Sequence, residues 1–364
     1  MKENNRNNNL GTLHLLAAFF VIYGHQCVFL GAGVPMFFGS SIHALGVKII
    51  FLISGYLIMK SLSAQEGSVK KICLEYAVKR IGRLYPELAV CLVVTALVIG
   101  PLFTSLGIID YFVQGRAAVG GYVIKNLFLF CTYDLPGMFE SNPYPGAVNG
   151  SLWTMPVEVF VYVVLLVFFI GMYKFRISKH VYGIFTCLVS AAFLAKFILC
   201  PNARIVFYGT DWMSALNVMP YMFIGGACYL YPIQKYLNVQ RAMFLLLAAG
   251  GLMFRTDFVR EAVCLALFPY IVFSLGLADE QRLKLRFLKG EYAYGLYLWG
   301  FVVQQCLVQK CYVEHAAVRA EDAVVMAAIS AAIAYVLAGV SYHLVYMPFC
   351  KRNKKLVALI QKRL

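Results

Sequence analysis

The sequence predicts an all-α polytopic membrane protein with about ten transmembrane helices. Three observations lead to this fold class: an apolar composition, recurring apolar stretches, and basic residues that fall on alternate loops. Of the 364 residues, 61% are hydrophobic and only 13% are charged, and the mean hydropathy is +0.74. Because a soluble domain carries about a quarter charged residues, this composition indicates a chain whose solvent is lipid.

Apolar segments long enough to cross a hydrocarbon core of about 30 Å as helices recur along the whole chain. We expect spans at residues 10–29, 43–60, 87–107, 155–173, 181–199, 215–231, 241–254, 259–278, 291–310 and 323–347. They predict a single membrane domain over residues 10–349. The Asn-rich residues 1–9 are expected to form a short disordered cytoplasmic tail, and residues 350–364 a basic cytoplasmic tail.

The net charge of +15 sets the orientation of the chain and does not indicate nucleic acid as a partner. Lys and Arg concentrate on one side of the expected spans. The segments on that side are 1–9, 60–86, 174–179, 235–241, 282–289 and 350–364. By the positive-inside rule this side is cytoplasmic. Both termini are therefore expected in the cytoplasm, which requires an even number of spans.

The external loop 108–154 differs from the other connections. Its apolar stretch Tyr122–Cys131 is too short to span, and the Pro/Gly/Asn-rich segment Leu135–Gly150 follows it. We expect a re-entrant or interfacial segment here. The eleven cysteines contain no CxxC pair and no His/Cys cluster, so they predict small buried hydrophobic side chains and no metal site.

The first and fourth spans carry ionisable side chains that are expensive to bury in a membrane, which makes them functional candidates. His14 and His25 are eleven residues apart, about 16 Å along a helix and close to the same face. Glu158 opens the fourth span in front of a long apolar run, and His25 is its expected partner. His25 and Glu158 are the predicted catalytic residues, and His14 is a predicted pocket residue. The alternative for each histidine is a neutral ring that forms a hydrogen bond between helices.

Lys48 of the second span either lines a pocket or extends its amine outward to the interface. Ser54 and Tyr56, on either side of Gly55, are also predicted pocket residues, with close helix packing as the alternative for the Ser-Gly pair. The following loop carries the segment Arg80–Pro86, with Pro86 expected to mark the turn into the membrane.

Arg80 and Arg83 lie on one helical face and, with Tyr85, predict a phosphate site on the cytoplasmic side. Ordinary positive-inside anchoring is the alternative explanation of these arginines. Trp153, Tyr297 and Trp299 are candidate walls of a pocket for a sugar or an adenine. They would otherwise be interfacial belt residues.

In order along the chain, these motifs resemble the acyltransferase-3 family of bacterial inner-membrane acyltransferases, which O-acetylate surface glycans. The matching pieces are the His25 position, Phe51 to Tyr56, Arg80 to Pro86, Trp153 to Glu158 and Tyr294 to Trp299. Three positions depart from the family pattern. His14 stands where the family has an Arg, Lys48 where it has an acidic residue, and Gly300 where it has a His.

The resemblance implies a multi-pass enzyme of the bacterial inner membrane that moves an acyl group, acetyl in the first instance, from acyl-CoA to a sugar hydroxyl. The acceptor would be a cell-surface glycan or a lipid-linked saccharide. Acetyl-CoA would be a co-substrate, with no bound cofactor. Phosphates of the donor would lie near Arg80 and Arg83, and His25 would accept the hydroxyl proton or carry the acyl group. The alternatives are a transporter or flippase of a sugar or lipid-linked oligosaccharide, and a catalytically silent partner of a glycan-assembly complex.

Overall fold

The computed structural model describes residues 8–250, 256–277, 290–314 and 319–363. It confirms the predicted all-α polytopic class, since nearly all regular structure in these ranges is helical. The helices are α1 (Leu10–Phe29), α2 (Ile42–Ser63), α3 (Val69–Val94), α4 (Gly100–Phe103), α5 (Ile108–Val113), α6 (Arg116–Leu127), α7 (Thr154–Phe175), α8 (Lys179–Leu199), α9 (Trp212–Ala215), α10 (Met219–Leu230), α11 (Val239–Gly250), α12 (Asp257–Gly276), α13 (Ala293–Leu307), α14 (Ala323–Ser341) and α15 (Met347–Arg363).

Within the described ranges, eight helical segments are long and apolar enough to cross a membrane. They are Leu10–Phe29, Ile42–Ser63, Val69–Phe103, Gly150–Phe175, Lys179–Leu199, Trp212–Leu230, Asp257–Gly276 and Ala323–Gln361. The other two expected spans correspond to the shorter helices α11 and α13. The last residues of the span expected at 241–254 lie outside the described part of the chain.

Two short antiparallel hairpins precede the helices that they orient. In the first, β1 (Met36–Phe37) pairs with β2 (Ser40–Ser41) directly before α2. In the second, β3 (Val206–Phe207) pairs with β4 (Thr210–Asp211) directly before α9.

Most of the connection expected over residues 60–86 is helical, and the turn expected at Pro86 was wrong. Helix α3 begins at Val69 and continues through Pro86, and a π-helical turn at Thr95–Ile99 joins it to α4. Arg80 and Arg83 are therefore part of a long helix, and Pro86 does not mark a turn. The apolar residues that follow Pro86 extend the helix without a break, since a proline is compatible with a helix when neighbouring structure satisfies the freed carbonyl.

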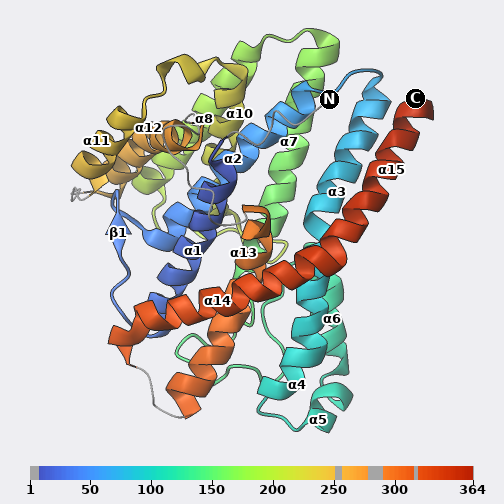
Figure 1. The fold of residues 1–364 in the computed structure, drawn as a ribbon. Helices are drawn as coiled ribbons and strands as arrows, with labels where there is room; N and C mark the ends of the chain where they lie inside the picture. Colours follow the sequence, from blue (N-terminus) through green and yellow to red (C-terminus); the bar gives the residue numbers. More distant parts are fainter. Residues whose placement is uncertain (1–7, 251–255, 278–289, 315–318, 364) are drawn as a thin grey trace.

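Parts of both predicted tails pack against the rest of the described chain. Residues 350–363 belong to α15, which packs along α3 (Figure 1). The side-chain amide of Asn353 donates to the carbonyl of Val78 at 3.1 Å. A π-helical turn at Tyr342–Tyr346 joins α14 to α15, and such turns are a known cause of helix bends. At the other end, residues 1–7 lie outside the described part. Asn9 is buried, and its backbone amide donates to the carbonyl of Gly276 at 2.8 Å.

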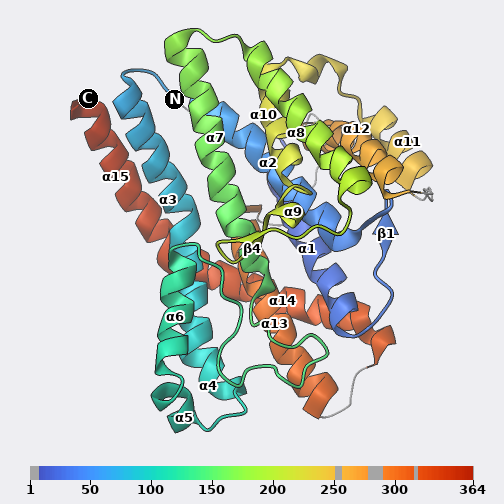
Figure 2. The ribbon, with the colours of Figure 1, turned by 180° about the vertical axis from the view of Figure 1, so that it is seen from behind.

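The external loop folds back against α3, as expected for a re-entrant segment. Figure 2 shows α6 beside the lower part of α3, with α4 and α5 at the turn between them. The hydroxyl of Tyr111 donates to the carbonyl of Ala96 at 2.8 Å, and Tyr122 is buried. The α2–α3 and α7–α8 connections and the end of α15 lie at the opposite end of the molecule (Figures 1 and 2). The basic connections are thus gathered at one end, as the charge pattern predicted.

Helix α2 packs between α1 and α10 through glycines. A Cβ atom on Gly55 would overlap the carbonyl of Met222 on α10, and one on Gly46 would lie 2.5 Å from the carbonyl oxygen of Ala17 on α1. Lipid supplies no hydrophobic force between helices, so small residues that let backbones approach are the basis of such packing. The predicted packing role of Gly55 is confirmed.

Gly55→Ala should destabilise the protein, because a methyl group at this position requires α2 and α10 to move apart. Overpacking of this kind costs about 1–3 kcal/mol. The measurement is the thermal unfolding midpoint of the purified protein in detergent. Gly120→Ala is the matched control, since a Cβ there meets open space. Equal midpoints for the two variants would contradict the packing role.

Candidate functional site

Two cavities lie among the helices, and the predicted site residues divide between them. The arginine cavity has a volume of about 120 Å³ and is bounded by α1, α2, α3, α7 and α13. Its lining residues include His14, Val47, Ser54, Arg80, Arg83, Thr154, Glu158, Tyr162, Tyr294 and Tyr297. The histidine cavity has a volume of about 740 Å³. Its lining residues include His25, His43, Val47, Lys48, Tyr133, Tyr144, Trp153, Arg204, Asp211, Asn217 and Tyr297.

Helical spacing explains why these side chains gather in the arginine cavity. Arg80 and Arg83 are three residues apart on α3, so both point to the same side. On α7, Thr154, Glu158 and Tyr162 follow one another at intervals of four residues and form one stripe. The two helices present these sets to each other across the cavity.

Aromatic rings surround both guanidinium groups. The Arg80 guanidinium lies 5.3 Å from the ring centroid of Tyr76 and 5.7 Å from that of Tyr162. The Arg83 guanidinium lies 5.5 Å from the rings of Tyr294 and Tyr346. Aromatic faces attract cations at such distances and leave donor groups at the guanidinium edge available to an anion. The Nε atom of Arg80 has no hydrogen-bond partner among the described residues.

Glu158 does not meet His25, its expected partner. The hydroxyl of Tyr162 donates to the Glu158 carboxylate, and Arg80 and Arg83 share its cavity, whereas His25 lines the other cavity. The difference arises from depth, because Glu158 shares the cavity of the two arginines and His25 lines the other cavity.

The two histidines of α1 also separate. His14 lines the arginine cavity and His25 the histidine cavity, because eleven residues of helix hold them about 16 Å apart. Their predicted common face is consistent with this arrangement, since both cavities lie on the α2 side of α1.

The histidine cavity is lined by imidazole, aromatic and polar side chains. The ring centroids of His25 and His43 are 5.4 Å apart. Trp153 and Tyr144 add aromatic faces, and the segment before α10 adds Asp211. Burial acts to raise the pKa of Asp211, but hydrogen bonds from the Ser214 hydroxyl and two backbone amides outweigh it, so this pKa lies below its ordinary value. Asp211 is therefore a carboxylate at neutral pH.

Val47 and Tyr297 line both cavities and so form the wall between them. The hydroxyl of Tyr297 lies 3.0 Å from the hydroxyl of Thr154 and donates to the carbonyl of Ser151 at 3.2 Å. Both partners belong to the start of the α7 segment. The turn there is fixed by Asn149, whose side chain accepts from the amide of Ser151 at 3.1 Å.

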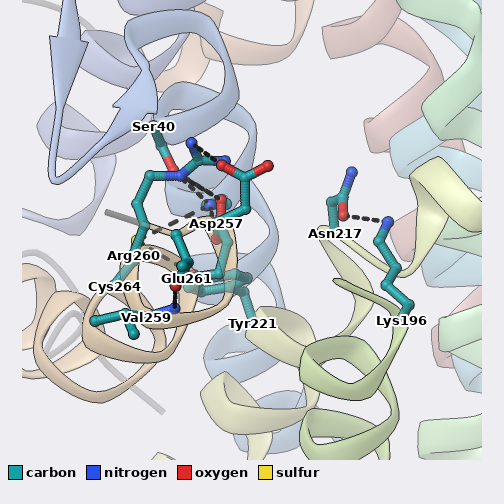
Figure 3. Close-up of polar contacts among 11 residues, drawn as sticks. Ser40, Lys196, Asn217, Tyr221, Asp257, Val259, Arg260, Glu261 and Cys264 are labelled. Carbon is teal, nitrogen blue, oxygen red and sulfur yellow. Dashed lines mark hydrogen bonds and ion pairs between the residues drawn. The ribbon is translucent and has the colours of Figure 1, made fainter. Parts of the chain in front are cut away.

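Lys48 does not extend to the interface, so that expectation was wrong. Its side chain is 2% exposed, and its ammonium donates to Glu261 of α12 at 2.6 Å and to the hydroxyl of Ser40 at 2.9 Å. Figure 3 shows Glu261 close to Ser40 and to the Asp257–Arg260 ion pair at the start of α12. A lysine at this depth keeps its charge only beside a carboxylate, and Glu261 supplies it.

A second buried lysine fixes the far side of the histidine cavity. The Lys196 ammonium of α8 donates to the carbonyl of Met213 at 2.5 Å and to the side chain of Asn217 at 2.6 Å (Figure 3). Asn217 lines the histidine cavity, so this contact positions part of its wall.

Three predicted site residues lie outside the lining of either cavity. Tyr85 packs against the core. Tyr56 is buried between Tyr229 and Phe273. The indole of Trp299 donates to the hydroxyl of Ser341 on α14 at 3.0 Å, so it holds two helices together. Trp153, Tyr297, Ser54, His14 and Lys48 do line a cavity, as expected.

Sequence reasoning missed several cavity residues: His43, Tyr133, Tyr144, Tyr162, Arg204, Asp211 and Asn217. It also missed Glu261. The signal for Glu261 was present, because it is the single carboxylate inside the expected span 259–278, as Glu158 is in the fourth span. His43 lies at the very start of α2 and carries no such signal.

Removal of one partner of the Lys48–Glu261 pair should destabilise the protein by about 3–5 kcal/mol, since it leaves a buried charge without compensation. Lys48→Met and Glu261→Met should each lower the unfolding midpoint in detergent more than the double variant does. Asp257→Asn is the control, because that carboxylate is 64% exposed and its pair with Arg260 is a surface one. A double variant as unstable as the sum of the two single variants would refute the coupling.

Comparison with known proteins shows which family the chain is similar to. Residues 7–343 match the acyltransferase-3 family, described as an acyltransferase domain. An O-acetyl transferase of Shigella phage Sf6 is 29% identical over 160 residues, 44% of this chain and 45% of the phage protein. Nodulation protein 10 of Rhizobium leguminosarum bv. viciae is 29% identical over 166 residues, 43% of each chain.

The aligned region thus spans less than half the length of these two relatives. No solved structure shows significant similarity to the chain. The family match, by contrast, covers nearly the whole chain and all the residues that line the two cavities. The chain therefore belongs to the acyltransferase-3 family.

Proposed function

We propose that this membrane acyltransferase moves an acetyl group from acetyl-CoA to a sugar hydroxyl of a cell-surface glycan or lipid-linked saccharide. The observation that carries the proposal is the pair of cavities that meet at Val47 and Tyr297. One cavity carries guanidinium groups suited to an anionic donor, and the other carries imidazoles and aromatic rings suited to a hydroxyl-bearing acceptor. The O-acetyl transferase name of the phage relative supports the reaction class.

The arginine cavity is assigned to the donor. Guanidinium groups match phosphate geometry, and those of Arg80 and Arg83 are held in place by aromatic rings. A cavity of about 120 Å³ is smaller than the usual site for a whole small molecule, which is about 300–1,000 Å³. The phosphates of the donor would therefore lie beside Arg80 and Arg83 on the cytoplasmic side, with the thioester end directed toward Tyr297.

The histidine cavity is assigned to the acceptor. Its volume of about 740 Å³ lies in the range of small-molecule sites, which are lined by aromatic side chains and a few polar groups that fix orientation. Trp153 and Tyr144 provide the aromatic faces, and Asp211 and Asn217 provide acceptors for sugar hydroxyls.

In the proposed reaction the acyl carbon lies beside Tyr297, where the cavities meet. The acceptor hydroxyl loses its proton to the imidazole of His25 as its oxygen attacks that carbon. The new C–O bond forms, the C–S bond of the thioester breaks, and the proton finally resides on the sulfur of coenzyme A. Glu158, held by Tyr162, orients the guanidinium groups on the donor side.

The orientation follows from the basic connections at one end of the molecule, which the positive-inside rule assigns to the cytoplasm. Acetyl-CoA is made in the cytoplasm, so the donor would enter from that end. We accordingly propose a location in the bacterial inner membrane, with both termini cytoplasmic. A transporter or flippase gains no support from the family match.

Membranes that contain the protein should transfer label from radiolabelled acetyl-CoA to glycan, and Glu158→Gln should abolish the transfer while protein levels hold. The change removes the carboxylate that shares the cavity with Arg80 and Arg83. The measurement is the label recovered in saponifiable esters of the glycan fraction. Absence of label with wild-type membranes and native glycan would overturn the proposed function, and sugar counterflow without label would indicate a carrier.

Arg83→Ala should raise the KM for acetyl-CoA about tenfold to a hundredfold, since a hydrogen bond to a charged group contributes about 1.5–3 kcal/mol. Lys79→Ala is the matched control. This lysine lies on the same helix and pairs with Glu75, but it does not line the cavity. Equal KM values for the two variants would remove Arg83 from the donor site.

A further inference from the structure

His43 is a second histidine beside His25, and it has no role in the proposed reaction. The two rings come from neighbouring helices, α1 and α2, with centroids 5.4 Å apart and planes inclined at 36°. Both line the histidine cavity. Phe29 and Phe301 cover other sides of His25 at 6.1 and 5.4 Å, so His43 is the polar ring next to it.

The backbone of α1 is shaped to admit His43. A Cβ atom on Gly24 would lie 2.7 Å from both Cβ and Nδ1 of His43 and 2.8 Å from its backbone nitrogen. Any other residue at position 24 would push α2 and its imidazole away. Gly24, the residue before His25, therefore permits the close approach of His43.

The Nδ1 atoms of both rings are buried and have no hydrogen-bond partner among the described residues. A buried polar atom without a partner calls for an explanation, and a catalytic role is one such explanation. The Nε2 atom of His43, on the opposite side of its ring, lies 3.2 Å from the hydroxyl of Ser41. His43 thus connects the side of His25 to a hydroxyl at the start of α2.

We infer that His43 is a second proton-transfer residue, which takes over the proton that His25 removes from the acceptor hydroxyl, with the Ser41 hydroxyl beside its Nε2 atom. The inference rests on the proposed function. When the C–S bond of the thioester breaks, the proton returns through His25 to the sulfur of coenzyme A. Each transfer breaks one bond to hydrogen and forms another, and both imidazoles are neutral again for the next acceptor.

Other titratable and charged groups around the pair belong to several elements. They are Lys48 with its partner Glu261, Tyr133 and Tyr144 of the loop after α6, Arg204 and Asp211 before α9, and Tyr297 of α13. Lys48 is neutralised by Glu261. Two adjacent imidazoles titrate as a pair, with apparent pKa values that belong to both rings.

The experiment measures acetyl transfer to glycan over a range of pH for the wild type, His43→Ala, His43→Asn and His25→Ala in membranes. His25→Ala should be inactive. Both His43 variants should lose about a hundredfold in kcat, the lower end of a general acid–base contribution, with the KM for acetyl-CoA unchanged. The acid limb of their pH profile should shift, because one of the two coupled ionisations is gone. Ser41→Ala should give a smaller loss in the same direction.

His180→Ala is the matched control, since this exposed histidine at the start of α8 contacts Tyr231 and lines neither cavity. Protein levels in the membrane and unfolding midpoints identify variants that fail to fold. If His43→Ala does not fold, His43→Asn still tests the inference, because asparagine is close to histidine in size. His43 variants with wild-type kcat and pH profile would overturn the inference while leaving the proposed function intact. An inactive wild type would instead defeat the proposed function.

Discussion

The close approach of α2 to the helices on either side of it is the constraint on which both cavities depend. Gly46 meets the backbone of α1, and Gly55 meets that of α10. Between these contacts α2 carries Val47 and Lys48, and nearly two turns later Ser54, so its depth and rotation decide which side chains reach each cavity. Because lipid is as apolar as the helix surfaces, close packing and internal polar contacts hold the helices together. A shift of α2 would therefore alter both cavities at once.

The buried charged side chains of this protein are stabilised by residues of other structural elements and not by their immediate neighbours in sequence. The ammonium of Lys48 meets a carboxylate from α12, and the ammonium of Lys196 meets carbonyl and amide oxygens before α10. The guanidinium groups of α3 face the carboxylate of α7. The Lys48 pair joins residues 213 positions apart, and the Lys196 contacts join α8 to the segment before α10, because a charge buried in a membrane must be stabilised by the protein itself. The polar side chains that line the cavities are thus also what fixes the helices around them.

The fold class was predictable because composition and span length indicate a chain surrounded by lipid, and the alternation of basic loops indicates its topology. Local helix spacing also sufficed to place Arg80 with Arg83 and to pick out Glu158. The pairing of residues from different helices was not predictable: Glu158 was assigned to His25, and Lys48 was left between a pocket and the interface. Both errors arise from depth and rotation, which a single sequence does not state. His43 escaped notice for the same reason, since its importance comes only from the glycine of another helix that lets it approach. The continuous course of α3 through Pro86 was missed because a proline beside basic residues also fits a loop.

The wall formed by Val47 and Tyr297 has a consequence for the energetics of the cell. If donor and acceptor sides open to different compartments, the insulation of the membrane at this point is about one tyrosine ring thick. The hydrogen bonds that hold Tyr297 to Thr154 and Ser151 then do more than shape a site. Under the proposed function, they would also limit proton leakage between the two sides of the membrane.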